Sequence, residues 1–159
     1  MEYTSLDSYQ HYSECAELVE GLGYYLVELK ISPQRGVTQV QSVVASKDSG
    51  ENISVNDCAK VHRALLSRLE EILGTDNIAM ELSSPGMERN IKNAAEFRFF
   101  VGRKIRVFSK SVSDWIGGEL VSSDDKSVSL KVESENPEVD GTVRTVEYQD
   151  IAKAKFIHI

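Results

Sequence analysis

The sequence predicts a two-domain α+β protein. An N-terminal α-β-β-α-β domain, with two helices on a mixed three-stranded sheet, is expected over residues 1–84, a joint over residues 85–93, and a small β-barrel over residues 94–159. Helix-like and strand-like periodicities alternate in the first half, short β-rich runs follow one another in the second, and positive charge is concentrated between them. A length of 159 residues suits one or two domains, since a domain takes roughly 100–200 residues and can be as small as about 50.

The first element is expected to be an amphipathic helix over residues 6–22. Its apolar positions recur at helical spacing, and glycines follow that can end it. Tyr9 and Tyr12 lie on the apolar stripe and are assigned to the core, with nucleotide stacking as the alternative. Residues 24–32 then alternate between apolar and polar side chains, and residues 37–46 are rich in valine, so these two runs predict an antiparallel hairpin.

The second helix has clear start and stop signals. Ser54 can cap its first turn, and Ile53 and Cys58 are placed as a hydrophobic staple. Gly74 is expected to end the helix, and residues 78–83 to form a third strand. Because a helix separates this strand from the hairpin, it should run parallel to one partner in a mixed sheet.

A turn motif follows the third strand. Pro85 and Gly86 suit the two central positions of a type II turn, because proline fixes φ and glycine tolerates a positive φ. A simple strand-end turn and a joint between two domains both explain this motif. The residues assigned to the joint are Ser83, Ser84, Pro85, Gly86 and Arg89.

The second half predicts short strands. Asn93 can cap a short helix over residues 94–101. Glycine in the second run, at Gly117-Gly118, fits a bend or bulge, and Trp115 is either a core residue or an exposed contact. Five short runs at such spacing are typical of a small, strongly bent barrel. The runs cover residues 104–109, 115–122, 127–132, 143–148 and 151–157.

The charge distribution is uneven. Residues 85–110 hold seven Lys/Arg against two Glu, whereas the whole chain has a formal net charge of -7. An acidic total argues against non-specific coating of nucleic acid, since that binding depends on neutralising phosphates. It is compatible with a local basic patch on an otherwise acidic surface.

Sequence motifs of catalysis are absent, so we expect no catalytic residue, no cofactor and no metal ligand. No phosphate-binding glycine loop, HExxH or GxSxG occurs, and the three histidines lie in separate elements. Cys15 and Cys58 fit reduced thiols, no apolar run is long enough for a membrane span, and the N-terminus does not resemble a signal peptide. A cytoplasmic, non-enzymatic protein is expected.

Three segments, residues 53–58, 81–89 and 97–107, resemble the bacterial RimP family of ribosome maturation factors. The central motif of that family reads Ser-Ser-Pro-Gly-Leu-Asp-Arg-Pro-Leu. In this chain, Asn90 stands where the motif has proline after the arginine. The positions that match are Ser83, Ser84, Pro85, Gly86 and Arg89. The resemblance implies an N-terminal α/β domain, a C-terminal SH3-like, Sm-related barrel, and a role in assembly of the small ribosomal subunit.

The resemblance also implies partners: the immature small subunit, its rRNA and a basic ribosomal protein of the decoding region. We expect a monomer without a membrane partner. Arg89 has a second explanation, as a hydrogen-bonded part of the joint, and at most two of the three cations around residue 104 can share a strand face. The candidate ribosome contacts are Arg89, Arg103, Lys104, Arg106 and Lys110, whose charge can neutralise phosphates.

The alternative function is a free-standing, Sm-like RNA-binding regulator. Residues 111–159 count against it, because they hold five Lys/Arg and ten Asp/Glu. A stable ring in solution and affinity for isolated single-stranded RNA would favour this alternative. An enzyme would instead need a deep pocket with converging titratable groups.

Overall fold

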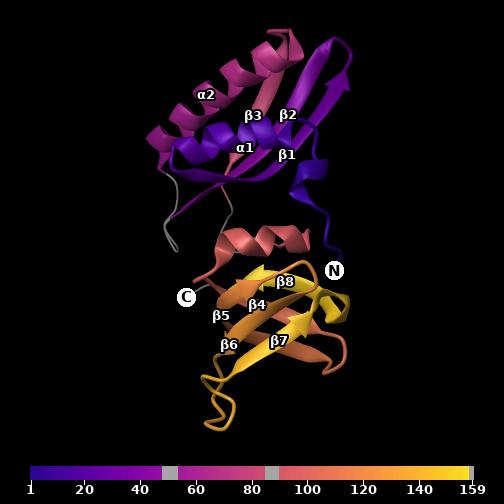
Figure 1. Ribbon diagram of the computed structural model, residues 1–159, viewed down its shortest axis with the longest axis vertical. Helices are drawn as coiled ribbons and strands as arrows, with labels where there is room; N and C mark the ends of the chain where they lie inside the picture. Colours follow the sequence, from indigo (N-terminus) through magenta and orange to yellow (C-terminus); the bar gives the residue numbers. More distant parts are fainter. Residues whose placement is uncertain (48–53, 85–89, 158–159) are drawn as a thin grey trace. The chain divides into compact units, whose positions relative to one another are not determined.

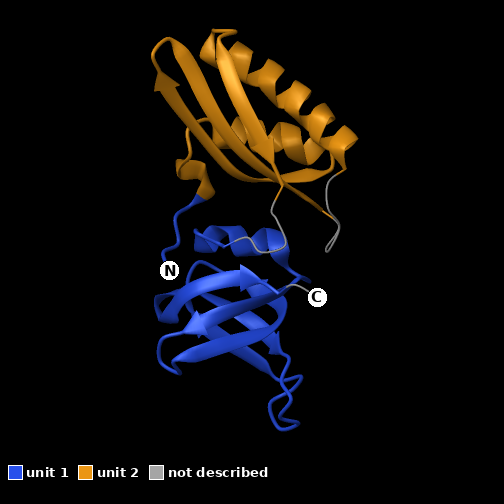
Figure 2. Ribbon diagram, turned by 180° about the vertical axis from the view of Figure 1, so that it is seen from behind, with its two compact units in different colours: residues 1–5, 86–159 blue, residues 6–85 orange. Residues whose placement is uncertain are grey.

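The computed structural model describes residues 1–47, 54–84 and 90–157 of the chain. The chain forms two compact units (Figure 2). In chain order, we call residues 6–85 (orange, labelled unit 2 in Figure 2) the first unit, and residues 1–5 together with 86–159 (blue, labelled unit 1) the second unit. The first five residues pack with the second unit: Thr4 exchanges two hydrogen bonds with the Asn93 side chain, of 2.9 and 2.8 Å, and Tyr3 stacks on Tyr148.

The first unit has the predicted α-β-β-α-β order. Its helical start differs from the expectation, because His11 adopts a left-handed conformation with φ of 60° and separates a 3-10 turn from the α-helix. The elements are η1 (Leu6–Ser8), α1 (Tyr12–Gly21), β1 (Tyr24–Gln34), β2 (Val37–Ser46), α2 (Val55–Leu73) and β3 (Ile78–Ser83).

The sheet of the first unit is mixed, as predicted. Its order is β1-β2-β3, with an antiparallel first pair and a parallel second pair. Both α-helices lie on the same side of this sheet (Figure 1). A register shift between Leu26 and Glu28 interrupts the predicted alternation of β1, so that Leu26 and Val27 are both buried.

The caps of α2 confirm the sequence signals. The Ser54 hydroxyl accepts a hydrogen bond of 3.1 Å from the backbone N–H of Asp57, and the helix ends at Gly74, whose φ is 66°. Ile53, the other half of the predicted staple, lies outside the described residues. The apolar stripe of the helix packs inward through Val61, Leu65 and Leu69.

The second unit carries the five predicted strands. The segment predicted as a helix over residues 94–101 is a 3-10 helix, capped by Asn93 in a capping box with Glu96. The elements are η2 (Ala94–Phe100), β4 (Lys104–Ser109), β5 (Asp114–Ser123), β6 (Ser127–Val132), β7 (Val143–Glu147), η3 (Tyr148–Asp150) and β8 (Ile151–Phe156).

These strands form one antiparallel sheet in the order β7-β6-β5-β4-β8. In the part of the chain that the structure describes, β7 and β8 do not pair, so the sheet is open and the closed barrel is not shown. The short η3 turn carries the chain from the edge strand β7 to the opposite edge, beside β4. The core of the unit contains Phe97, Phe100, Ile105, Leu120 and Leu130.

The two glycines of β5 do not form the bulge that the sequence suggests. The register shift lies further on, between Leu120 and Ser122. Gly118 instead sits against the neighbouring strand, where an added Cβ would lie 2.1 Å from the carbonyl oxygen of Lys131. The absence of a side chain therefore allows β5 and β6 to approach each other closely.

Candidate nucleic-acid interface

Strand β4 presents its charged residues on the outer face of the five-stranded sheet. Ile105 and Val107 are buried, whereas Lys104 and Arg106 are exposed, as expected for side chains that alternate along a strand. Arg103, the third candidate cation, precedes the strand. Two of the three cations therefore share a face, within the limit that the alternation predicts.

Arg103 is packed against aromatic rings of the second unit. Its guanidinium carbon lies 4.2 Å from the ring centroid of Phe156 and 6.0 Å from that of Phe100. Burial lowers the pKa of this guanidinium. Such cation–π contacts stabilise the fold, so the packing role of Arg103 is well defined.

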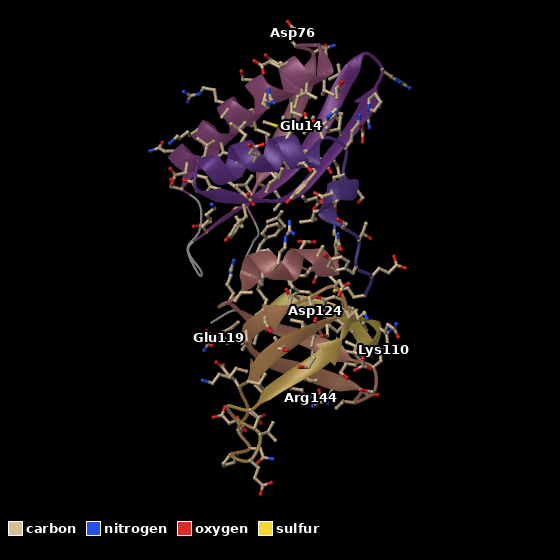
Figure 3. All side chains as sticks on the ribbon, viewed as in Figure 1. Glu14, Asp76, Lys110, Glu119, Asp124 and Arg144 are labelled. Carbon is tan, nitrogen blue, oxygen red and sulfur yellow. The ribbon has the colours of Figure 1, made fainter. Side chains whose placement is uncertain are left out.

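Lys104 and Lys110 are engaged at opposite ends of β4. The Nζ of Lys104 lies 2.8 Å from a carboxylate oxygen of Glu133, and both side chains are about half exposed. Lys110 donates to the carbonyl of Gln149, at 3.3 Å, from the turn that follows the strand. Figure 3 shows Lys110 and Glu119, the residue paired with Lys104, at opposite ends of the sheet.

Asp150 fixes the turn that contains Lys110. Its carboxylate accepts hydrogen bonds from the Ser109 hydroxyl and from the backbone and hydroxyl of Ser111. These bonds, led by that of Ser109, lower the pKa of Asp150, and the charge of Lys110 adds to the effect. The turn is therefore held by a carboxylate that stays ionised.

Arg106 belongs to a cluster that the sequence did not assemble. Its guanidinium carbon lies 4.6 Å from the ring centroid of Trp115, and the Nζ of Lys155 lies 6.0 Å from the same centroid. Phe108 meets Trp115 edge to face, with centroids 5.5 Å apart. We call the outward-facing residues Arg106, Phe108, Trp115, Lys153 and Lys155 the outer-face cluster.

The register of three strands brings the outer-face cluster together. On β4, Arg106 is opposite Lys155 of β8, and Phe108 is opposite both Trp115 of β5 and Lys153 of β8. The sequence did not decide whether Trp115 is a core residue or an exposed contact. In the structure it is half-buried on the outer face of the sheet. The spacing of Lys153 and Lys155, two positions apart in a strand, could have predicted from the sequence that they share a face. Which residues lie beside them on the neighbouring strands could not be predicted from the sequence.

The joint is described only in part. Ser83 ends β3 opposite Val43 and is exposed, and Ser84 follows it half-buried. Pro85, Gly86 and Arg89, including the candidate contact and the predicted type II turn, lie outside the described residues.

In residues 1–47, 54–84 and 90–157, no group of three or more His, Cys, Asp or Glu side chains could hold a metal ion, and no helix is long and apolar enough to cross a membrane. Cys15 and Cys58 are free thiols, and burial raises the pKa of Cys15 to about 11.

Comparison with known proteins agrees with the motif at the end of β3. The family model for the RimP N-terminal domain matches residues 14–88. The ribosome maturation factor RimP of Borrelia hermsii is 29% identical over 150 residues, which cover 94% of this chain and 96% of that protein. The RimP of Borrelia recurrentis is 31% identical over 101 residues, covering 64% of this chain and 68% of that protein.

A third relative, the RimP of Albidiferax ferrireducens, is 35% identical over 113 residues, covering 67% of this chain and 54% of that protein. The matches include the segments on both sides of the described joint residues. The chain belongs to the RimP family of ribosome maturation factors.

Proposed function

We propose that the protein is a non-enzymatic maturation factor for the small ribosomal subunit, which binds the immature subunit in the cytoplasm as a monomer. Its partners in this proposal are small-subunit rRNA and a basic ribosomal protein of the decoding region. The observation that carries the proposal is that cations gather on one face of the five-stranded sheet, although the whole chain has a net charge of -7. The relatives of the chain are named as ribosome maturation factors.

Charge separation supports binding to a mixed surface of RNA and protein. Cations on β4 and β8 can neutralise phosphates, while the acidic remainder limits binding to unrelated RNA. The exposed segment between β6 and β7 is acidic and can complement a basic ribosomal protein. Its acidic residues are Glu133, Glu135, Glu138 and Asp140.

The candidate contacts differ in how available they are. Arg106 is exposed and lies on Trp115, which leaves its guanidinium edge for a phosphate or a base. Lys104 and Lys110 can exchange their present partners, Glu133 and a carbonyl, for phosphates, because exposed ion pairs contribute little. Arg103 contributes first to packing, and Arg89 is retained as a contact or a part of the joint.

We further interpret the second unit as an SH3-like, Sm-related fold. Five short antiparallel strands with register shifts, followed by a 3-10 turn before the last strand, support this interpretation. In the same proposal, residues 85–93 join the domain predicted over residues 1–84 to that predicted over residues 94–159, while residues 1–5 group by their contacts with the second unit.

Co-sedimentation with immature small subunits tests the proposed function. Binding should weaken steeply with salt, and Arg106→Glu should weaken it and reduce the salt slope by about 1. Arg144→Glu is the matched control: Arg144, labelled in Figure 3, is exposed on β7 opposite the inward-facing Leu130. The proposal fails if the native protein does not co-sediment and its removal leaves subunit levels and rRNA processing unchanged.

A further inference from the structure

The outer-face cluster combines stacking surfaces with cations, which is the combination that single-stranded nucleic acid requires. We propose that this cluster binds an unpaired RNA segment: a base stacks at Trp115 and Arg106, and Lys153 and Lys155 bind the adjoining phosphates. The inference rests on the proposed function, since it identifies the kind of RNA and the surface that receives it.

The sheet register gives the cluster a fixed geometry. Trp115, Phe108 and Lys153 form one row across three neighbouring strands, and Gly117, Arg106 and Lys155 form the next. The strands place adjacent rows about two residues apart, a distance that a nucleotide and its phosphate can span. Side chains on rigid strands are held more precisely than side chains on loops.

The floor of the second row is apolar. Gly117 has no side chain, and an added Cβ there would lie 3.2 Å from the Cδ1 atom of Ile157. Ile157 is half-buried in this position. A base that stacks beside Arg106 would therefore contact hydrocarbon and aromatic surface, and the charged groups of the cluster would lie around its edge.

The charges of the cluster lack local neutralisation. Within the described ranges, no carboxylate lies within ion-pairing distance of Arg106, Lys153 or Lys155, in contrast to the pair of Lys104 with Glu133. Arg106 and Lys155 thus lie over the Trp115 ring, and Lys153 is paired with Phe108, without an ion pair to any described carboxylate. A polyanion supplies the missing charge and releases counterions when it binds.

The aromatic component selects RNA over an acidic protein, and an unpaired strand over a duplex. Acidic peptides need cations but have no planar group that stacks on an indole or a guanidinium, whereas every base does. Bases in a duplex are already stacked on each other and are not available to a ring on a sheet surface. We therefore commit to single-stranded RNA as the occupant.

The sequence contains one tryptophan, so the tryptophan emission of the native protein, excited selectively over tyrosine, reports on Trp115 alone. An oligouridylate of about ten nucleotides, which is within the site size of known single-strand binders, should change the emission of Trp115. The change should saturate at the same concentrations as the fluorescence anisotropy of the labelled RNA. Binding seen by anisotropy without a change in emission would overturn the inference, and so would no binding at low salt.

Two competitors address the other classes of partner. A blunt-ended RNA duplex should change the emission much less than the oligouridylate. Polyglutamate tests an acidic protein: if polyglutamate changes the emission and the oligouridylate does not, the surface binds acidic protein and the inference is wrong.

Variants separate stacking from charge. Trp115→Ala should weaken binding of the oligouridylate by about ten-fold, and Trp115→Phe should recover most of the loss. The double variant Arg106→Gln, Lys155→Gln should weaken binding and reduce the slope of log K against log salt by about 0.7, since Lys155 is its phosphate contact and each such contact to a single strand contributes about 0.7. Circular dichroism checks that each variant is folded.

A matched control removes the same charges elsewhere. The double variant Lys47→Gln, Arg144→Gln also loses one lysine and one arginine, and its Lys47 lies over an aromatic ring, that of Tyr25, at 5.6 Å. This control should keep both the emission change and the salt slope. An equal loss in both double variants would show that only net charge matters and would overturn the inference.

Failure of the inference and failure of the proposed function give different results. If the native protein co-sediments with immature subunits but Trp115 does not respond to RNA, the proposed function stands and the inference is wrong. If Trp115 responds as expected but the protein does not co-sediment and its removal leaves subunit levels and rRNA processing unchanged, the RNA surface is supported and the proposed function is wrong.

Discussion

Replacement of Gly118 by alanine should destabilise the second unit strongly. An added Cβ would lie 2.1 Å from the oxygen and 2.7 Å from the carbon of the Lys131 carbonyl, and 3.0 Å from the Cα of Val132. All three atoms belong to the backbone of β6, so no side chain can rotate away. The strand pair must separate by more than one ångström at this point, since ordinary contacts begin at about 3.4 Å.

The expected cost is about 3 kcal/mol, the upper part of the range for overpacking, because the backbone must move. For a unit of this size, that cost lowers the melting temperature by about 12–24 °C. Gly117→Ala is the matched comparison: the nearest atom there is the Cδ1 of Ile157 at 3.2 Å, the flexible end of a side chain. Its cost should stay below about 1 kcal/mol.

Urea denaturation followed by Trp115 fluorescence measures both variants, because Trp115 lies on β5 itself. A third variant, Gly21→Ala, provides a reference in the first unit, since nothing lies within 4 Å of the added Cβ. If Gly118→Ala and Gly117→Ala have the same stability within about 0.5 kcal/mol, the close approach of β5 and β6 does not constrain the fold and the reasoning is refuted.

Three further predictions concern single side chains. Tyr12→Phe should cost about 0.5–1.5 kcal/mol, because the buried hydroxyl donates to the carbonyl of Leu26 at 2.5 Å; chemical denaturation that shows no loss would contradict this role. At a pH of about 8, iodoacetamide should alkylate Cys58 well before Cys15, since burial raises the pKa of Cys15 to about 11; mass mapping that finds Cys15 labelled first would exclude this order. The hydrogen bonds to Asp150 lower its pKa from 3.8, so their stabilisation is present above that value and is lost as the pH falls through the lower, folded-state pKa. Asp150→Asn should therefore flatten the loss of stability in acid, and an unchanged acid transition would count against it.

Local patterns predicted most of the secondary structure. Residues 37–46, 78–83, 104–109 and 127–132 form strands with the predicted bounds. Turn residues or helix signals flank each run, and exposure alternates along β3, β4 and β6, whereas residues 42–45 of β2 are all buried. The parallel pairing of β2 and β3 also followed, because a helix between two strands of one sheet leaves few alternatives.

The missed features depend on backbone detail or on distant pairing. The first helix starts late because His11 takes a left-handed conformation, which the residue type does not require. Whether a five-stranded sheet closes depends on how its two edge strands meet, and that is not encoded in the period of either strand. Strand order, too, had to come from the structure.

The sequence predicted that the candidate site would be basic, but it did not predict which residues would come together to form it. Arg106 was found because basic residues are dense between the two halves. Trp115, Lys153 and Lys155 join it only through the registers of β4 with β5 and with β8; the β8 register pairs Phe108 with Lys153 and Arg106 with Lys155, 45 and 49 positions apart. Lys104 and Lys110 gained partners, Glu133 and the Gln149 carbonyl, that no spacing rule indicates.

The hydrogen bonds between Thr4 and Asn93 have a consequence for the order in which the chain folds during synthesis. They span 89 residues, and the first five residues belong to the unit that is completed last. The unit of residues 6–85 has all of its strands once residue 85 has left the ribosome, whereas the N-terminal segment must wait for residues 86–159. Residues 1–5, which are made before the unit of residues 6–85, thus find their partners only after that unit is complete and a long loop has closed.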